Sequence, residues 1–344
     1  MKILYSVQAT GNGHISRAME LLPFLQKYGE VDIFLSGANS TLSLDAPIKY
    51  RSKGISLFYT CTGSLDFTRL VKNFHPAQLW KEVNELPVEK YDLVLNDFDS
   101  VTAMACARKK KASVNFGHQA SFMSEKTPRP GKKSFVGEWI LKNYAKANQY
   151  IGLHFDSYDD FIYSPVIKSE ILNAEPTKGG YITVYLPAYC DQILHPIFSK
   201  HKDVSFQIFS HQRNEPTRID NITYIPVGKQ AFNESLIHCD GLITGGGFET
   251  PAEAIALKKK LIAIPIKGQY EQQCNAAALR NLGVKTFDDL GNDFKDGMND
   301  FLYHDQPIDH KYHYSTQEIV DLLMAKCANM DFSLDFNYPE LMFN

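Results

Sequence analysis

Side chains able to exchange protons stand directly after short apolar runs at several points of the sequence. Each of these runs is typical of a buried strand. Asp97 and the pair His118-Gln119 end two of them, and His14 follows the glycine turn after another. The carboxyl ends of parallel strands meet at one edge of a sheet, which is where ligands bind in open α/β folds. The sequence therefore predicts a polar cleft in which either His14 or Asp97 serves as a general base. A helix start disfavours a charged imidazolium, so His14 is expected to be neutral and basic.

The turn before His14 contains two glycines, Gly11 and Gly13, and leads into a segment with apolar residues at helical spacing. With the strands on either side it makes a β-turn-α-β unit. A dinucleotide-binding turn would carry a third glycine where Ser16 stands, so the sequence argues against NAD. The alternative interpretation of His14 is a helix residue that bonds only the backbone.

A second glycine turn, 245–247, joins an apolar run at 236–243 to a predicted helix. The run is typical of a buried parallel strand. Thr250 is expected to cap the helix, with Pro251 in its first position and Glu253 in the place of a capping-box carboxylate. Such a turn leaves backbone amides uncovered at a helix N-terminus, where phosphate binds readily. A turn without any ligand is the alternative.

Alternating strands and helices must position both turns. The first half of the chain has strands expected at 3–7, 31–36, 91–97, 113–119 and 150–155. The stretch 156–175 contains two acidic clusters and no clean period, which indicates a linker. A second series follows, with strands expected at 181–187, 204–209, 222–226 and from 261, and with a last helix at about 316–329.

Composition restricts the classes of function. The chain has 344 residues, a length typical of two domains, and its formal net charge of -3 argues against nucleic-acid binding through bulk charge. The six cysteines form no Cys-x-x-Cys pair, which favours reduced thiols and a cytoplasmic location. No run is long enough to span a membrane.

Charged segments outside these motifs have simple explanations. The lysine runs 109–111 and 258–260 fall at predicted helix C-termini, where cations complement the helix dipole. The histidines between 304 and 313 lack the spacing of zinc ligands, so no metal site is predicted. The basic, proline-broken loop 126–133 is typical of an exposed loop. Contact of this loop with an anionic acceptor, or with lipid headgroups at the inner face of the membrane, stays open.

Three motifs in a fixed order resemble GT-B glycosyltransferases, and more closely the MurG-like group: 11–18, 245–253 and 272–276. The resemblance covers most of the chain. It implies an α/β fold with two Rossmann-like β/α/β domains that face a central cleft. The domains would be an acceptor-side domain at 1–158 and a nucleotide-sugar-binding domain at 159–320. A helix and tail at 321–344 would pack back on the first domain.

The resemblance also implies roles for individual residues. Glu253 would bind the ribose of a UDP-sugar, and Gln272 would reach the sugar, with Gln273 as its rival in register. The base on the acceptor side would be His14, with Asp97 as the alternative. Further donor contacts would come from Thr244, Gly245, Gly246, Gly247, Thr250 and Asn275, and acceptor-side contacts from Gly11, Gly13, Arg17, His118 and Gln119.

The implied reaction is inverting, metal-independent transfer of a hexosyl or N-acetylhexosaminyl group from a UDP-sugar to a hydroxyl acceptor, without a further cofactor. The acceptor could be a glycolipid, a glycan or a small molecule. The chain departs from the family at 186–189, where Leu-Pro-Ala-Tyr replaces a glycine-rich loop. Two alternatives stay open. A UDP-sugar hydrolase or 2-epimerase is one, because the turn at 11–17 also resembles the hydrolase of nonulosonic-acid synthesis, and a non-catalytic nucleotide-sugar-binding subunit is the other.

Overall fold

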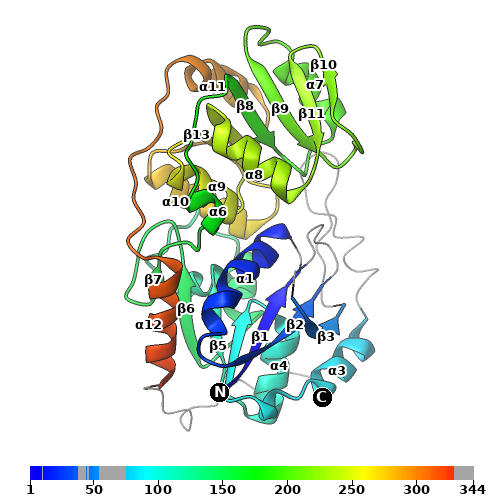
Figure 1. The fold of residues 1–344 in the computed structure, drawn as a ribbon, viewed down its shortest axis with the longest axis vertical. Coiled ribbons are helices and arrows are strands. Elements are labelled where there is room, and N and C mark those ends of the chain that lie inside the picture. The colour runs from blue at the N-terminus through cyan, green and yellow to red at the C-terminus, as the bar shows by residue number, and fades with distance from the viewer. Residues whose placement is uncertain (10, 38–43, 45, 54–74, 329–344) are drawn as a thin grey trace.

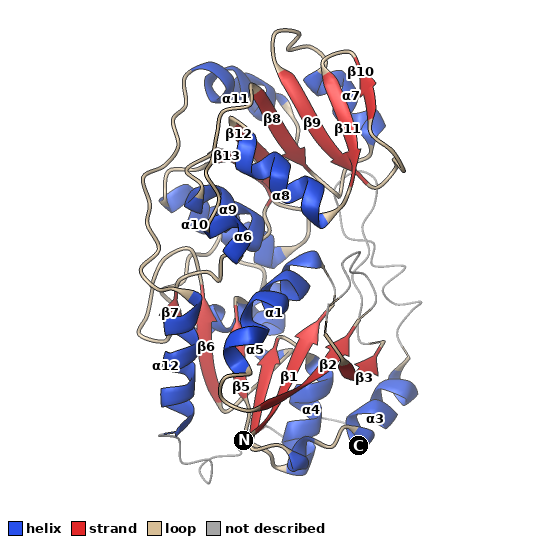
Figure 2. Cartoon of the chain, in the orientation of Figure 1, coloured by secondary structure: helices blue, strands red, loops and turns tan. Residues whose placement is uncertain are grey.

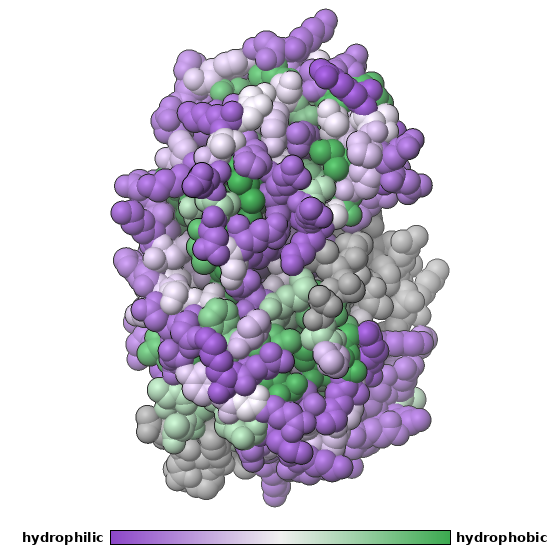
Figure 3. Space-filling view, in the orientation of Figure 1, coloured by the Kyte–Doolittle hydropathy of each residue, from purple (hydrophilic) through white to green (hydrophobic). Residues whose placement is uncertain are grey.

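Two domains, each built on a seven-stranded sheet, make up the molecule (Figure 1). The computed structural model describes residues 1–9, 11–37, 44, 46–53 and 75–328. Strands and helices alternate along most of this length (Figure 2). The face of the molecule seen in Figure 3 is covered mainly by hydrophilic residues, with smaller apolar areas between them. None of the helices in the described ranges has the length and apolar character that a bilayer crossing requires.

The first sheet has the order β3-β2-β1-β4-β5-β6-β7, and its described pairs are parallel. Its strands are β1 (Lys2–Gln8), β2 (Glu30–Ser36), β3 (Ile48–Ser52), β4 (Leu93–Asp97), β5 (Val114–Gly117), β6 (Gln149–Leu153) and β7 (Ile162–Tyr163). The helices around it are α1 (Asn12–Leu25), α3 (Pro76–Glu85), α4 (Ser100–Lys109) and α5 (Phe135–Asn143). The order of winding reverses between β1 and β4, and ligands bind at such a switch point.

The second sheet has the order β10-β11-β9-β8-β12-β13-β14 and is parallel except for β10. Its strands are β8 (Tyr181–Tyr185), β9 (Ser205–Ser210), β10 (Thr217–Ile219), β11 (Ile222–Pro226), β12 (Gly241–Gly245), β13 (Lys260–Ile264) and β14 (Lys285–Thr286). Its helices are α6 (Ser169–Leu172), α7 (Asp191–Phe198), α8 (Lys229–His238), α9 (Glu249–Ala256), α10 (Tyr270–Asn281) and α11 (Asn292–Tyr303). The winding reverses between β8 and β12, so the 245–247 turn lies at the switch point of this sheet.

Apolar contacts join the two domains. The largest cluster of buried apolar side chains contains residues of both sheets. Phe155 of the first domain packs against Phe248 of the second, with ring centroids 5.0 Å apart. At Gly137 of α5 a β-carbon would lie 2.3 Å from the Tyr270 ring of α10, so the absence of a side chain permits this close approach. The interface is therefore packed as well as hydrogen-bonded.

The chain returns to the first domain at its end. Helix α12 (Thr316–Ala328) lies beside α1, and the hydroxyl of Tyr28 donates a hydrogen bond to Asp321 of α12 (Figure 1). A second contact joins Lys27 to Gln317. The expected tail from 329 onward lies outside the described residues.

Several local predictions are wrong. The strand expected at the end of 236–243 is present as β12, which starts at Gly241, whereas the first part of that stretch completes α8. Helix α9 begins one residue before Thr250 and has Phe248 as its N-cap, so Thr250 is not the cap. Glu253 pairs with a lysine and forms no capping box.

The prediction that all cysteines are reduced thiols is wrong for Cys190, which is disulfide-bonded. The sequence has no Cys-x-x-Cys pair or other short cysteine spacing that would have predicted this disulfide. The free cysteines in the described part of the chain are all buried: Cys106, Cys239, Cys274 and Cys327.

Candidate active site

His14 and Asp97 meet at the switch point of the first sheet. β1 and β4 pair with Val7 opposite Asp97, so the end of β4 lies beside the turn that follows β1. Gly11 is the N-cap of α1, which places His14 in the first turn of that helix. The Nδ1 atom of His14 is 3.0 Å from Oδ1 of Asp97. When Nδ1 donates its proton to this carboxylate, Nε2 keeps its lone pair and is free to act as a base.

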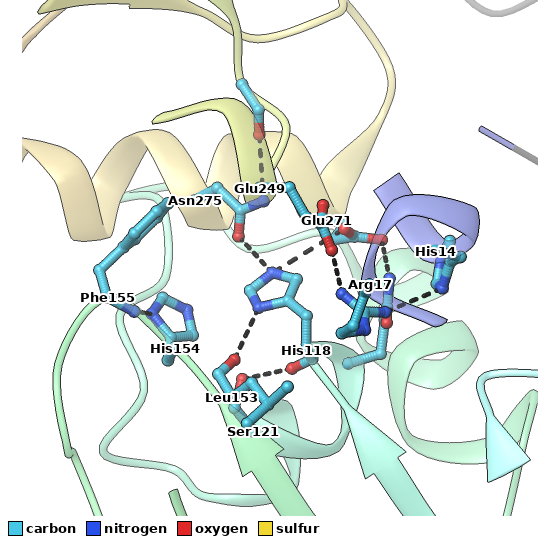
Figure 4. Close-up of polar contacts among 12 residues, drawn as sticks. His14, Arg17, His118, Ser121, Leu153, His154, Phe155, Glu249, Glu271 and Asn275 are labelled. Atoms are coloured by element: carbon cyan, nitrogen blue, oxygen red, sulfur yellow. Dashed lines mark hydrogen bonds and ion pairs between the residues drawn. The ribbon is translucent and has the colours of Figure 1, made fainter. Parts of the chain in front are cut away.

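Arg17 holds the same carboxylate from a second side. Its Nε donates to Oδ2 of Asp97 at 3.1 Å and its Nη2 donates to Oδ1 at 2.7 Å. Its Nη1 donates to Glu249, the first residue of α9 in the other domain (Figure 4). The side chains of Arg17 and Asp97 are 1% and 0% exposed, so water does not screen this ion pair. Arg17 therefore supports Asp97 from behind the cleft.

The ionisation of the pair follows from these contacts. Burial alone would lower the pKa of His14, but the charge of Asp97 and its hydrogen bond outweigh burial and raise that pKa above its usual value. Burial alone would raise the pKa of Asp97, but Arg17 and His14 lower it to about 2. Asp97 is thus ionised at neutral pH and a weak base. This combination favours His14 as the base and Asp97 as the group that orients it.

Phe98 follows Asp97 in a strained conformation. Its φ of 57° lies in the left-handed region, which a bulky residue seldom adopts, and its side chain lines the cleft. The next residue, Asp99, accepts a hydrogen bond from the backbone of Thr102 at 2.6 Å and caps α4. The two carboxylates of this Asp-x-Asp sequence therefore serve separate hydrogen-bond sets. Within the described ranges, no group of three or more His, Cys, Asp or Glu residues could hold a metal ion.

His118 connects the two domains. Its Nδ1 is 3.0 Å from the carbonyl of Leu153, and its Nε2 is 2.8 Å from Oδ1 of Asn275 in α10 (Figure 4). Asn275 in turn donates to the carbonyl of Gly246 at 3.0 Å. The His118 ring stacks on Phe248, with centroids 3.9 Å apart. Burial is the largest influence on His118 and lowers its pKa. These contacts fix the glycine turn of the second domain relative to the end of β5.

A cleft of about 830 Å³ lies between the two domains. The predicted site residues that line it are Gly11, Gly13, His14, His118, Gln119, Thr244, Gly245, Gly247, Thr250 and Gln272. The predicted residues that do not line it are Arg17, Asp97, Gly246, Glu253, Gln273 and Asn275. The cleft thus brings together one edge of each sheet, with His14 and the 245–247 glycine turn both in its lining.

Glu253 lies behind the wall of this cleft. It is 2% exposed, and its carboxylate is 3.1 Å from Nζ of Lys168. Lys168 also donates to Asn233 at 2.8 Å. Burial raises the pKa of Glu253, and the charge of Lys168 opposes this rise. The carboxylate of Glu253 therefore forms a buried ion pair with Lys168 and does not face the cleft.

Two acidic residues of the site were missed by the sequence reasoning. Glu249 and Glu271 both line the cleft, and Glu271 accepts a hydrogen bond from Gln119 at 3.0 Å. Glu249 stands inside the glycine-turn motif, but its partner Arg17 is 232 positions away. The sequence alone holds no local signal for such a pair.

The fold and the site define a class of protein. Two facing Rossmann-like domains with a cleft between their switch points form the GT-B fold of glycosyltransferases. The model of the family "Glycosyl transferase family 1" matches residues 1–305, so the chain belongs to this family of glycosyltransferases. A separate comparison with curated protein sequences gives no match.

Solved structures support the same fold. UGT89C1 of Arabidopsis thaliana, complexed with UDP, is similar with a TM-score of 0.60 and 13% identity over 95% of this chain and 99% of that chain. Spinosyn forosaminyltransferase SpnP matches with a TM-score of 0.58 and 13% identity over the same shares. MurG of Acinetobacter baumannii matches with a TM-score of 0.54 and 15% identity over 94% of this chain and 99% of that chain.

Proposed function

We propose that this glycosyltransferase moves a sugar from a UDP-sugar to a hydroxyl acceptor, with inversion at the anomeric carbon and without a metal ion. The observation that carries the proposal is the His14–Asp97 pair, whose ring nitrogen and carboxylate oxygen are 3.0 Å apart at a cleft opposite a glycine turn. UGT89C1, which has a similar fold, was solved with UDP and with UDP-L-rhamnose.

The proposed reaction is one displacement. Nε2 of His14 takes the proton of the acceptor hydroxyl while the oxygen forms a bond to the anomeric carbon. The bond from that carbon to the diphosphate breaks on the opposite face, and UDP leaves with the electron pair. Asp97 stabilises the imidazolium that results. Proton abstraction of this kind typically contributes on the order of a hundred- to ten-thousand-fold in rate.

The departing diphosphate needs stabilisation on the other wall. The amides of the 245–247 turn and the N-terminus of α9 supply oriented donors there, with Thr250 beside them in the lining. Gln272, the favoured sugar contact, lines the cleft, whereas its rival Gln273 does not. A ribose contact by Glu253 requires its pair with Lys168 to open.

The donor is tested by calorimetry and thermal unfolding with UDP, UDP-glucose, UDP-galactose and UDP-GlcNAc, with and without EDTA. A ligand at a hundred times its Kd stabilises the fold by about 2.7 kcal/mol. We expect UDP species to raise the unfolding temperature equally in EDTA. The proposal fails if no UDP species binds, or if EDTA abolishes turnover. UDP release without any acceptor would instead identify a hydrolase, and binding without turnover would identify a non-catalytic subunit.

We further propose that the acceptor lies at a membrane surface that contains anionic lipid. The apolar side chains of α5 form an exposed stripe, with exposed fractions of 86%, 64%, 56% and 41% for Phe135, Val136, Trp139 and Ile140. Exposed Lys132 and Lys133 directly precede Ser134, the N-cap of the helix. Aromatic side chains beside lysines suit the interface of an anionic bilayer. Ile140 also lines the cleft, so the stripe leads to the acceptor side.

Sedimentation with vesicles tests this surface. Wild type should sediment with vesicles of phosphatidylcholine and phosphatidylglycerol and less with phosphatidylcholine alone. The double variant Phe135→Ser/Trp139→Ser should lose most of the bound fraction, and Lys132→Glu/Lys133→Glu should lose the preference for anionic lipid. Trp80→Ser is the matched control, because Trp80 is 48% exposed on α3. Equal sedimentation of wild type and the double variant would refute the proposal.

A further inference from the structure

Glu249 of the second domain touches the catalytic pair of the first domain only through Arg17. We propose that Glu249 is a positioning residue for His14: it completes the charge environment of the base, so that the base reaches full strength only when the two domains are in contact. This inference rests on the proposed function of His14, and it assigns to the donor-side domain a part in acceptor activation.

Arg17 forms an ion pair with a carboxylate of each domain: Asp97 in the first and Glu249 in the second. Its Nε donates to Asp97 at 3.1 Å. Its Nη2 donates to Asp97 at 2.7 Å and also lies 2.9 Å from Nδ1 of His14, and its Nη1 donates to Glu249. The packing around this contact is close, because a β-carbon on Gly13 would lie 2.4 Å from Oε2 of Glu249. Gly13 therefore has to be a glycine for the carboxylate to reach Arg17.

The charges of the cluster explain what Glu249 adds. Arg17 carries one positive charge, and Asp97 and Glu249 each carry one negative charge, so the cluster has a net charge of -1 when His14 is neutral. Proton uptake by His14 brings the cluster to zero. Without Glu249 the same uptake would leave a buried net charge of +1, which low-dielectric surroundings disfavour.

The charged groups that face His14 come from its own helix and from two other elements. Asp97 ends β4, Arg17 lies one turn further along α1, and Glu249 begins α9. Burial lowers the pKa of His14, and the charge and hydrogen bond of Asp97 oppose it. Arg17 lowers this pKa and Glu249 raises it, both by less than Asp97 does. Tyr5 of β1 is part of the same cluster, but burial raises its pKa well above 10, so it stays neutral.

Separation of the domains would remove Glu249 from Arg17 and weaken the base. An open enzyme would then be poor at activating either the acceptor or a water molecule. Closure would restore the negative charge at the moment when the glycine turn and its bound donor come into place. The Arg17–Glu249 contact thus makes the basicity of His14 depend on contact between the two domains.

The test uses Glu249→Gln, which keeps the size of the side chain and removes its charge. We expect the His14 ring, followed by NMR in the protein without substrate, to titrate at a lower pH than in wild type. Because neutral imidazole is the active form, the acidic limb of the rate profile should move to lower pH as well. Turnover should fall on the order of tenfold, less than the loss expected when the base itself is removed. Glu249→Asp should restore part of both effects.

Tyr270→Phe is the matched control. It removes another hydrogen bond between the domains, from the Tyr270 hydroxyl to Glu138 at 2.7 Å, without touching the cluster. The His14 titration should be unchanged in this variant. The inference is overturned if Glu249→Gln folds and leaves the His14 titration where it is in wild type, or if Tyr270→Phe moves it equally. The titration needs no substrate, so a failure to turn over UDP-sugars would count against the proposed function alone.

Discussion

Replacement of Asp97 by asparagine should destabilise the protein by an amount that depends on pH. The side chain keeps its shape but loses its charge, so among the described residues Arg17 is left with Glu249 as its only carboxylate partner. Breaking a buried ion pair by removing one partner typically costs about 3 to 5 kcal/mol. The same change removes the anion that orients and stabilises a protonated His14.

The pH dependence can be worked from the ionisation of Asp97. Its pKa falls from 3.8 to about 2 on folding, which corresponds to roughly 2 kcal/mol of stability at neutral pH. A group with a lowered pKa in the folded state contributes this stability above its unfolded pKa and loses it as the pH falls through its folded pKa. About 1 kcal/mol should therefore be gone at pH 3. At pH 7, the measured loss in Asp97→Asn should be about 3 kcal/mol.

Urea unfolding of wild type and Asp97→Asn at pH 7, 5, 4 and 3 measures both quantities. The free-energy difference should shrink below pH 5 by about 1 kcal/mol. Asp99→Asn is the matched control, because burial raises the pKa of Asp99 and asparagine can keep its N-cap hydrogen bond. Its pH dependence should have the opposite sign. A pH-independent difference for Asp97→Asn, or a difference below 1 kcal/mol, would refute the reasoning.

Three further substitutions test the site, and two of them have a matched glycine substitution as a control. His14→Ala should lower the rate of UDP release in the presence of acceptor by on the order of a hundred- to ten-thousand-fold while the far-UV spectrum stays unchanged. Gly13→Ala should reduce turnover and spare UDP binding, because its β-carbon would lie 2.4 Å from the carboxylate of Glu249. Gly11→Ala should reduce turnover less, because none of the described residues lies within 4 Å of a β-carbon at that position. Gly246→Ala should lower the unfolding free energy by about 1 to 3 kcal/mol through contact with neighbouring backbone, and Gly247→Ala should change it less.

The sequence predicts the architecture well, because the fold depends on features repeated along the chain. Apolar runs of strand length alternate with helical periods in both halves, and the comparisons confirm the GT-B fold. Strand ends follow from the same pattern, which explains how His14 and Asp97 could be placed at one edge before the structure was known. A parallel register then brings them into contact.

The contacts between distant segments could not be predicted in this way. Helix propensity gives no reason for Arg17 to reach Glu249 or for Glu253 to find Lys168, since both pairs depend on how two folded segments pack. The start of α9 was also misplaced by two residues, because Thr250 and Pro251 both favour the beginning of a helix, whereas α9 begins at Glu249. Helix ends are set by such competing preferences, whereas strand order is set by the core.

The return of α12 to the first domain has a consequence for the order in which the protein can form during synthesis. Domains generally fold as units while the chain emerges, the N-terminal one first. Here α1 packs against α12, which ends at residue 328. This side of α1 therefore stays uncovered until the whole second domain and then α12 have left the ribosome. The second domain is in effect an insertion between two parts of the first. The N-terminal domain therefore starts folding first and is completed last.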